Sequence, residues 1–381
     1  MARRKKRMKM SKGLFITLVV LVLLICIAVF VLYKFYPDTF NKLFGKKNNP
    51  GANQADVVTL ASDDVSVHFL ELGNENSGDC SLIKTGDIEV LVDAGSATNS
   101  IDTISNYIDT YCTDGILEYV IVTHGDTDHI ACFAGSGGSE YKTIFDRYDC
   151  RVIIDFPLTN KNTAMYNRYI DERDAEVVNG AVHYTALQCY KNMDGAQRII
   201  TLAEGVEIEF LYHKYYETLD KYDENNHSVC FMLRDGDYKY LFTGDLEKDG
   251  EKSLIEMNKS VLCEVNVYKA GHHGSKTSST PELLEIISPE VVVFCCAMGR
   301  NQYDSAPENI FPTQAAVNNL KQYVDYNMYC GRALNEETGE VELYNGNIVF
   351  VSNDTEMKIY CSNETDTIAS NPWFQKYRMG A

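Results

Sequence analysis

The residues best suited to chemistry lie in VTHGDTDHIACF, where two histidines and two aspartates fall within six positions. They are His124, Asp126, Asp128 and His129. The stretch follows LEYVIV, whose apolar composition predicts a buried β-strand. Imidazole and carboxylate groups together suit zinc, manganese or iron(II). Because the motif offers more ligands than one tetrahedral ion needs, it predicts a two-metal site.

Three other predicted strands also end in a residue that can bind a metal. VLVDAG ends near Asp93, YLFTGD ends at Asp245, and VYKAGHHGSKTSS carries His272 and His273. Strand ends that lie side by side form a polar rim on a rigid scaffold, which is a common place for chemistry. The alternative is that these are solvated loop residues without a role in chemistry. The repetition of the pattern after four predicted strands disfavours this alternative.

The pattern between these motifs predicts a mixed α/β domain. Strand-like runs recur from VSVHFLEL to VVVFCCAMG, and helix-like runs such as SIDTISNYIDTYC and TPELLEIIS lie between them. Each half of the chain passes through several predicted strands before its helices. This order predicts two packed sheets with helices on the outside. The late run GEVELYNGNIVFVS predicts a hairpin that completes the second sheet.

The N-terminus predicts a membrane anchor. Residues 1–12 are strongly basic, and residues 13–33 contain no charged side chain. As a helix the apolar stretch would span about 31 Å, the thickness of one bilayer core. The basic segment is expected in the cytoplasm, followed by a linker at 34–63 and an extracytoplasmic domain at 64–381. An uncommonly long signal peptide is the alternative.

The charge distribution argues against a general nucleic-acid binder. The whole chain carries −19 and residues 1–47 carry +10, so residues 48–381 carry −29. Such a domain repels polyanions unless cations or a local basic groove intervene. The twelve cysteines contain no C-x-x-C pair, so no zinc ribbon is predicted.

From about Val65 to Ser352 the chain resembles the metallo-β-lactamase-fold hydrolases, in the branch like the C-terminal domain of the competence protein ComEC. The resemblance rests on SGDCSLI, VLVDAG, THGDTDHI, NNHSVCFML, YLFTGD and HHGSKTSS, which occur in this order. It implies an α/β (α+β) fold of the αββα sandwich type, here preceded by one transmembrane helix. It also implies two divalent metal ions, zinc or manganese, at one edge of the sandwich.

The resemblance gives each motif an expected role. The expected metal ligands are His124 and Asp126 for the first ion, Asp128, His129 and His272 for the second, and Asp245 between them. His227 is a further candidate for the first ion, with His213 as a weaker rival. A hydroxide held between the metals would be the nucleophile, and Asp128 is expected to be essential for catalysis. His68 and His183 are expected to be structural or exposed.

Other residues are expected to support the ligands or contact the substrate. Asp79 and Asp93 would orient the metal ligands. His273, Ser275 and Lys276 would contact substrate oxygens or protonate the leaving group, with His273 and Lys276 in catalytic roles. For Ser275 and Lys276, a turn and capping role before TPELLEIIS is the alternative.

The chain departs from the family pattern in two places. The short G-x-G-D turn is expanded to GNENSGD before Asp79. The motif N-x-Y-G-H-P is present only as NQYDSAPENIFP, in which Asn301 and Tyr303 align but no histidine follows. If that histidine assists catalysis in relatives, either His273 takes its role here or turnover is slow.

The expected function is a membrane-anchored, extracytoplasmic hydrolase that cleaves a phosphodiester. Two cations suit this chemistry because they stabilise the attacking and the leaving oxygen. Asp126 stands where lactamases of this fold commonly carry histidine, which disfavours β-lactam hydrolysis. The candidate substrates are a nucleic acid, a small phosphodiester, and a cell-envelope polymer such as a teichoic-acid-type ester. A non-catalytic metal-binding domain is the alternative from another class, and no obligate protein partner is evident.

Overall fold

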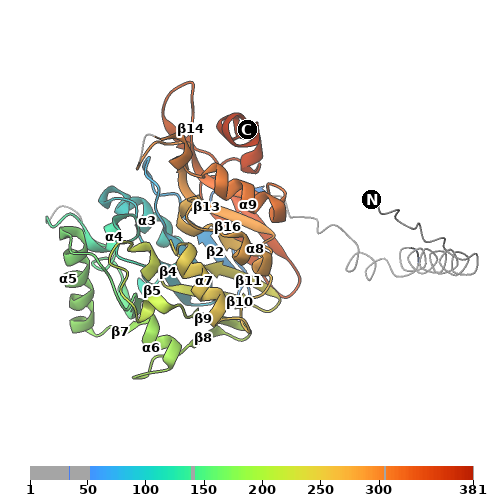
Figure 1. Ribbon diagram of the computed structural model, residues 1–381. Helices are drawn as coiled ribbons and strands as arrows, with labels where there is room; N and C mark the ends of the chain where they lie inside the picture. The colour runs from blue at the N-terminus through green and yellow to red at the C-terminus, as the bar shows by residue number, and fades with distance from the viewer. Residues whose placement is uncertain (1–33, 35–51, 139–141, 304–305, 381) are drawn as a thin grey trace, which may run out of the picture. The chain divides into compact units, whose positions relative to one another are not determined.

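The computed structural model describes residues 34, 52–138, 142–303 and 306–380 (Figure 1). The chain divides into two units, Met1–Asn49 and Pro50–Ala381. The predicted transmembrane segment at residues 13–33 lies outside the described residues. Within the part of the chain that is described, no helix combines the length and the apolar character needed to cross a membrane.

The globular unit begins earlier than the sequence predicts. Strand β1 (Ala52–Gln54) pairs in parallel with β17 (Met357–Cys361). Val58 is buried, and its backbone N–H donates to the hydroxyl of Tyr111 at 3.1 Å. Part of the segment predicted as linker, residues 52–58, therefore belongs to the sandwich.

Nine strands of the described residues form the first sheet. Their order is β1, β17, β16 (Ile348–Ser352), β2 (Val65–Phe69), β3 (Ser81–Thr85), β4 (Ile88–Val92), β5 (Ile116–Ile121), β6 (Asp149–Asp155) and β7 (Val182–Thr185). Strands β16, β2, β3 and β4 pair antiparallel, whereas β4 to β7 pair in parallel. Parallel neighbours need crossover connections. These contain α3 (Ile101–Ile108), α4 (Thr127–Ala134) and α5 (Ala164–Asn179).

Eight strands of the described residues form the second sheet. Their order is β15 (Val341–Leu343), β14 (Met328–Leu334), β13 (Val291–Met298), β12 (Val267–Lys269), β11 (Tyr238–Phe242), β10 (Cys230–Asp235), β9 (Val206–Leu211) and β8 (Ile199–Ala203). Strands β11 to β14 are parallel. Their crossovers contain α7 (Lys248–Met257), the short helix η4 (Gly271–Gly274) with α8 (Pro281–Ile287), and α9 (Gln314–Val324). The remaining helices include α6 (Ala186–Lys191) and, at the C-terminus, α10 (Pro372–Phe374) and η7 (Gln375–Met379).

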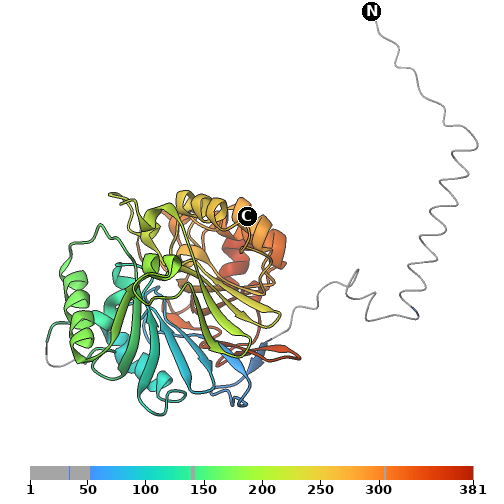
Figure 2. The same ribbon diagram turned by 90° about the horizontal axis from the view of Figure 1, so that it is seen from below.

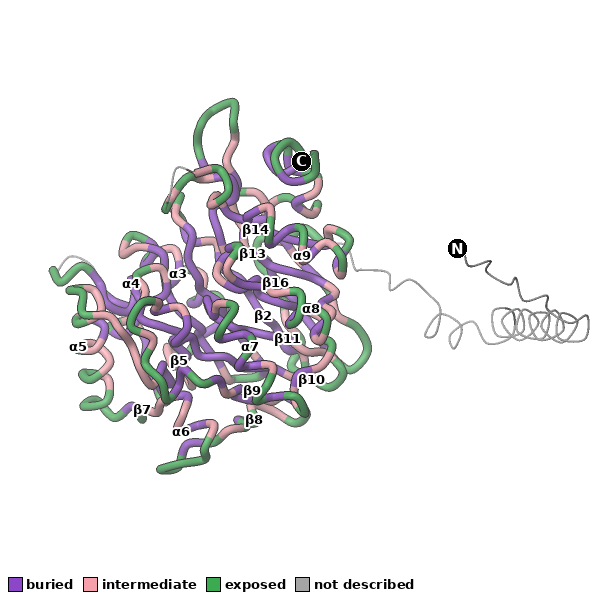
Figure 3. The backbone as a smooth tube through the Cα atoms, in the orientation of Figure 1, coloured by how far each residue is buried: buried purple, intermediate pink, exposed green. Residues whose placement is uncertain are grey.

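The two sheets pack face to face, with helices on their outer faces (Figure 2). Aromatic residues join the sheets: the rings of Phe69 and Phe242 stack at 5.8 Å, and Phe231 stacks on Phe242 at 4.7 Å. A second core lies between the second sheet and its helices, where Leu254 and Leu320 are fully buried. Figure 3 shows the central strands buried and the outer helices and edge strands partly exposed. The predicted sandwich of two sheets with outer helices is confirmed.

The predicted hairpin in GEVELYNGNIVFVS is wrong. Strand β15 pairs with β14 in the second sheet, whereas β16 pairs with β2 and β17 in the first. The chain therefore crosses between the sheets at residues 344–347. All five residues of β16 are buried, whereas Glu342 and Leu343 of β15 are exposed. The difference in burial agrees with their places, because β16 lies between two strands of the first sheet and β15 is the edge strand of the second.

Candidate metal centre

The residues that could bind a metal lie in loops that follow parallel strands. Asp93 follows β4 and His124 follows β5 in the first sheet. Asp245 follows β11, and η4 after β12 carries His272 and His273 in the second sheet. Because the carboxyl ends of parallel neighbours lie at the same edge of a sheet, these loops meet at one edge of the sandwich.

Four side chains from these loops and the helices that follow them, together with Asp79 from the connection between β2 and β3, form what we call the inner cluster. Its members are Asp79, Asp128, His129, Asp245 and His273. One ligand atom from each of these residues except Asp128 lies within 4.8 Å of the others. The Nε2 atoms of His129 and His273 lie 3.3 and 3.1 Å from Oδ2 of Asp245. Asp128 Oδ2 lies 3.4 Å from His273 Nε2. Asp128, His129, Asp245 and His273 therefore converge on one point, and Asp79 lies on the Nδ1 side of the two rings.

Each histidine of the inner cluster is oriented by a carboxylate behind its ring. His129 Nδ1 lies 2.8 Å from Asp93 Oδ2, and Asp93 accepts two hydrogen bonds of 2.7 Å from Thr123. His273 Nδ1 lies 3.1 Å from Asp79 Oδ1 and 2.9 Å from the carbonyl oxygen of Cys295. With Nδ1 held in this way, Nε2 of each ring points to the shared oxygen of Asp245. The geometry agrees with the orienting role predicted for Asp79 and Asp93.

Three buried imidazole nitrogens at this edge have no well-aligned hydrogen-bond partner among the described residues. They are the Nε2 atoms of His124, His129 and His273. A buried polar atom left in this state costs about 1–3 kcal/mol. Imidazole nitrogens beside carboxylate oxygens are the donor set that zinc, manganese and iron(II) bind. The residues present therefore fit a divalent transition metal.

The charge of the inner cluster also favours a cation. Burial disfavours the charged form of His273, but the carboxylates of Asp245 and Asp79 outweigh burial and raise its pKa. His129 shows the same effect: Asp245 and Asp93 raise its pKa against the effect of burial. The carboxylates thus outnumber the fixed positive charges, and the cluster gains from any bound positive charge.

Lys269 is a buried member of the site that the sequence did not assign. Its Nζ contacts Asp79 Oδ2, lies 3.2 Å from Asp245 Oδ1 and donates to the carbonyl oxygen of Gly244 at 2.9 Å. Burial disfavours its charge, but the carboxylates of Asp79 and Asp245 outweigh burial and raise its pKa. Because these contacts use all three N–H donors, Asp245 is left with Oδ2 to offer a metal. A lysine at the end of a fully buried strand is the feature that could have drawn attention to Lys269.

Three further residues form what we call the outer cluster: His124, Asp126 and His272. His124 Nε2 lies 3.6 Å from Asp126 Oδ2, and the rings of His124 and His129 are 4.1 Å apart. His272 Nε2 lies 3.9 Å from Asp245 Oδ2. The outer cluster is more open, since the side chains of Asp126 and His272 are 28% and 21% exposed. Asp126 also pairs with Lys161.

The structure separates the two histidines of HHGS. His273, expected at the substrate, is buried in the inner cluster, where its Nε2 lies 3.4 Å from Asp128 Oδ2. His272, expected as a metal ligand, lines the open cleft: its Nδ1 lies 3.4 Å from Glu247, and its Nε2 lies 3.9 Å from Asp245 Oδ2. Both residues have left-handed backbones, with φ of 46° and 54°, which turn their rings 65° apart. Sequence spacing alone does not reveal this conformation.

His227 does not reach the metal-binding edge. Its Nδ1 lies 3.1 Å from the carbonyl oxygen of Tyr215, and its Nε2 accepts from the backbone N–H of Asp220 at 3.2 Å. The prediction of His227 as a metal ligand is therefore not supported. The adjacent Ser228 lies closer to the site, where its hydroxyl is 3.5 Å from His124 Nδ1 and accepts from the Asp245 backbone N–H at 3.0 Å.

The remaining histidines lie in other surroundings. His213 is buried, and its Nε2 lies 2.8 Å from the carbonyl oxygen of Ser228. His68 is buried between Ser66 and Tyr107, and burial lowers its pKa to about 3. His183 pairs with Asp155 at 2.7 Å. The structural role predicted for His68 agrees with this packing.

A cleft of about 510 Å³ opens above the two clusters. Its lining includes Ser275, the exposed Lys276, Tyr303 and Phe311. The Tyr303 hydroxyl donates to Asp128 Oδ2 at 2.5 Å. Tyr303 is 53% exposed, but reduced hydration around its hydroxyl and the carboxylate of Asp128 raise its pKa, so the hydroxyl stays protonated. Ser275 interacts with Thr277 at 2.9 Å, which fits the turn role considered for it.

The two departures from the family pattern contact each other. In the expanded turn GNENSGD, the backbone N–H of Ser77 donates to Gln302 Oε1 at 2.6 Å. Arg300 donates to Asn76 Oδ1 at 2.6 Å. Gln302 belongs to the stretch that lacks the family histidine. The longer turn therefore packs on the altered stretch beside the cleft.

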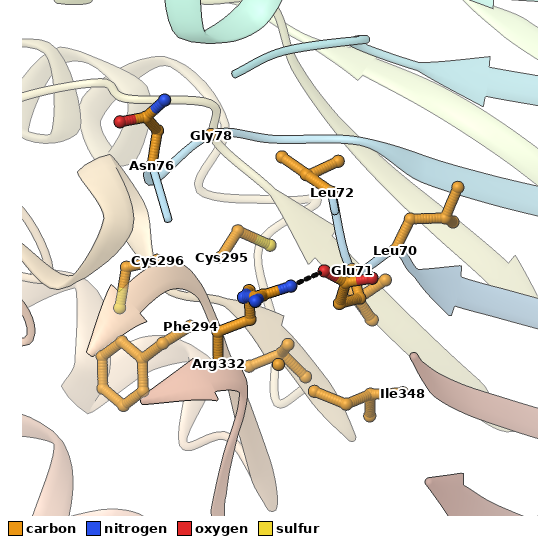
Figure 4. A pocket seen from close by; sticks show the side chains of 13 residues that line it. Leu70, Glu71, Leu72, Asn76, Gly78, Phe294, Cys295, Cys296, Arg332 and Ile348 are labelled. Carbon is orange, nitrogen blue, oxygen red and sulfur yellow. Dashed lines mark hydrogen bonds and ion pairs between the residues drawn. The ribbon is translucent and has the colours of Figure 1, made fainter. Parts of the chain in front are cut away.

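A separate cavity of about 30 Å³ lies behind this turn (Figure 4). Arg332 and Glu71 form an ion pair at its wall, with Cys295 and Cys296 nearby. A water molecule needs about 10–15 Å³ of such space, so the cavity has room for about two. It is too small for a substrate. The cleft of about 510 Å³ is the candidate active site because Asp126, Asp128, Asp245 and His272 line it.

Sequence comparison places these motifs among known proteins. Residues 73–135 match the metallo-beta-lactamase superfamily. The chain is 32% identical over 85 residues to ComE operon protein 3 of Bacillus subtilis, covering 22% of this chain and 10% of that protein. The chain resembles the metallo-β-lactamase superfamily in its ComEC-like branch.

Other similarities extend this picture. Competence protein ComA of Neisseria gonorrhoeae is 32% identical over 120 residues, which is 32% of this chain and 16% of that protein. The metallo-β-lactamase-like chain thus spans only 10% and 16% of the length of these two curated relatives.

Two solved structures are similar in fold at low sequence identity. The metallo-beta-lactamase fold protein YhfI of Bacillus subtilis matches with a TM-score of 0.42 and 13% identity, over 70% of this chain and 96% of that chain. CmlA, a diiron beta-hydroxylase from Streptomyces venezuelae, gives a TM-score of 0.37 and 13% identity, over 70% of this chain and 52% of that chain. Scores of this size say nothing about the activity of this chain.

Proposed function

We propose that this protein is a metal-dependent hydrolase that cleaves phosphodiesters at the inner and outer clusters. The observation that carries the proposal is the convergence of unpartnered Nε2 atoms and carboxylate oxygens around Oδ2 of Asp245. The inner cluster would hold one divalent ion, zinc or manganese, and the outer cluster a second. Two bound cations supply a nucleophile at neutral pH and stabilise the charge on the attacking and leaving oxygens.

The chain's own residues have distinct tasks in this proposal. Lys269 fixes Asp79 and Asp245, and Asp93 fixes the tautomer and orientation of His129. Tyr303 is a proton donor next to the cleft, at the position where the missing family histidine leaves that role open. Lys276 stands exposed at the cleft rim, where its charge suits a substrate phosphate oxygen.

The substrate proposal rests on charge and on the ligand types. Asp126 in the outer cluster adds a carboxylate where β-lactamases of this fold commonly have histidine, and an anionic phosphodiester benefits from the paired cations. The net charge of −29 over residues 48–381 opposes long polyanions. We therefore favour a small phosphodiester over a long polyanion, and a cell-envelope ester and a nucleic acid are the alternative substrates. The basic and apolar segments before residue 34 are the basis for proposing a membrane-anchored, extracytoplasmic enzyme.

The proposal is tested by a substrate panel on the full chain. Bis(p-nitrophenyl) phosphate, single-stranded DNA, a glycerol-phosphate polymer and a β-lactam are each assayed with manganese and with zinc. We expect metal-dependent cleavage of the phosphodiesters, fastest for the small diester, and no β-lactam hydrolysis. The variant Asp128→Asn should be inactive, and Asp102→Asn, an exposed aspartate of α3, serves as the matched control. Equal rates with and without EDTA would refute the proposal.

A further inference from the structure

The proposed catalytic function assigns no role to the C-terminal tail, residues 371–380. Asn371 caps α10 by accepting from the backbone N–H of Phe374 at 3.2 Å. Trp373, the only tryptophan of the chain, is 4% exposed, and Phe374 is fully buried. The tail is therefore packed into the domain, and its contacts show what it holds.

Arg378 connects the tail to the segment 310–313. Its Nε donates to the carbonyl oxygen of Pro312 at 2.6 Å, and its Nη2 donates to that of Ile310 at 2.9 Å. Its guanidinium lies over the ring of Trp373 at 4.6 Å. A planar guanidinium suits this arrangement because it donates in two fixed directions. The two acceptors flank Phe311 on either side in the chain.

A buried arginine in this position is costly for stability. Arg378 is 6% exposed, and among the described residues its partners are carbonyl oxygens and an aromatic ring. A buried charge without a carboxylate partner loses hydration that neutral acceptors replace only in part. An apolar side chain would fill the same space without this cost. We therefore attribute to Arg378 the role of fixing the backbone of the segment 310–313, which it binds through two carbonyl oxygens.

That segment forms a wall of the candidate active site. The Phe311 ring lies 5.9 Å from the rings of both His272 and His273, and 5.5 Å from that of Tyr303. The backbone N–H of Thr313 donates to the Gly274 carbonyl oxygen at 2.9 Å. A shift of this wall would change the width of the cleft above the metal-binding residues.

The tail also contacts the wall at a second place, where Trp373 packs against Gly299. The backbone N–H of Gly299 donates to the Phe311 carbonyl oxygen at 2.9 Å. Gly299 has φ of +87°, and a Cβ atom added there would lie 2.8 Å from the Trp373 ring. Gly299 thus lets the chain turn directly against the indole. Trp373 therefore contacts the chain at Gly299, and Arg378 contacts the segment 310–313. These are the two backbone segments that form the wall.

We propose that the C-terminal tail is a positioning element for the cleft wall, acting through Arg378 and Trp373. By fixing Phe311 it sets the space available to the part of the substrate that lies beside the metal-binding edge. This inference rests on the proposed function, because it assigns the cleft to substrate. Arg378 is a positioning residue and does not itself touch the substrate.

The test compares Arg378→Met with the wild-type full chain in two measurements. Amide hydrogen exchange of residues 299–303 and 306–313 reports the wall without requiring any activity. Kinetics with bis(p-nitrophenyl) phosphate report its effect on the site. We expect exchange about tenfold faster and KM raised about tenfold, since a charge-assisted hydrogen-bond pair is lost, with kcat and bound metal unchanged.

Two further variants separate this effect from general loss of folding. Lys376→Met removes an exposed tail residue that pairs with Glu336 at 3.0 Å, and it should change neither measurement. Arg378→Lys keeps the charge but loses the two-directional donor, so an intermediate KM is expected. Far-ultraviolet circular dichroism verifies that each variant is folded.

The possible results are distinguishable. Unchanged exchange in Arg378→Met overturns the inference whatever the activity. Faster exchange with unchanged KM in an active enzyme also overturns it, because the tail is then only structural. A fall in kcat together with loss of metal would contradict it as well. If the metal-loaded wild type cleaves no diester, the proposed function fails, while hydrogen exchange still decides whether the tail fixes the wall.

Discussion

The inner and outer clusters share the ion-binding residue types but differ in how those residues are supported. In the inner cluster, His129 and His273 each have a carboxylate behind the ring, and Lys269 balances the charge. In the outer cluster, Glu247 lies 3.4 Å from Nδ1 of His272, but His124 has only the hydroxyls of Thr123 and Ser228 near its Nδ1 among the described residues, and no buried lysine balances the charge there. A carboxylate makes the imidazole a stronger ligand than a hydroxyl does. We therefore infer that the inner cluster binds its ion first and more tightly.

The largest expected difference is between the two neighbouring histidines of η4. His273→Ala should remove the tightly bound ion and lower kcat by about a thousandfold or more, because several kcal/mol of charge stabilisation is lost. His272→Ala should weaken only the second ion and retain the first. Metal content and kcat of the two variants, purified in parallel, provide the measurement. Equal metal loss in both would erase the distinction between the clusters.

A smaller effect is expected when Lys269 is replaced, and it is measured as a change in the free energy of unfolding. It tests whether the inner cluster depends on this lysine for charge balance. Lys269→Met leaves the buried carboxylates of Asp79 and Asp245 without their counter-charge, which should lower the free energy of unfolding by about 3–5 kcal/mol. A bound cation replaces part of that charge, so the loss should shrink when metal is added. Urea unfolding with and without manganese tests this.

The matched control for Lys269 is Lys239→Met, which changes a lysine of β11 that is only half-buried. It should unfold like the wild type in both conditions. If the loss in Lys269→Met were the same with and without metal, the lysine would be packing in the core rather than balancing the inner cluster.

Sequence patterns were sufficient for the scaffold and for most of the site. Apolar runs ending in Asp93, His124 and Asp245 predict both the strands and their meeting at one edge, because parallel strands place their carboxyl ends together. The order of the motifs also gives the two-sheet sandwich. These features depend on local periodicity and on chain topology, which a sequence displays directly.

The parts that sequence did not give depend on conformation or on distant contacts. Residues His272 and His273 differ in role because of left-handed backbone angles, which spacing does not encode. His227 and Ser228 are adjacent, and only the course of the preceding turn decides which one faces His124. Lys269 resembles any other residue in a buried strand until its carboxylate partners are brought beside it. The same is true of Arg378, whose acceptors lie more than sixty positions away.

The measurement that tests the account most directly is the metal content of the wild-type protein. The full chain is equilibrated with manganese or zinc, passed through a desalting column, and analysed by mass spectrometry for bound metal per chain. The account predicts two ions per chain, of which one dissociates first during stepwise chelation and the other remains with the inner cluster. Fewer than about one transition-metal ion per chain would contradict the central claim that these clusters form a metal centre.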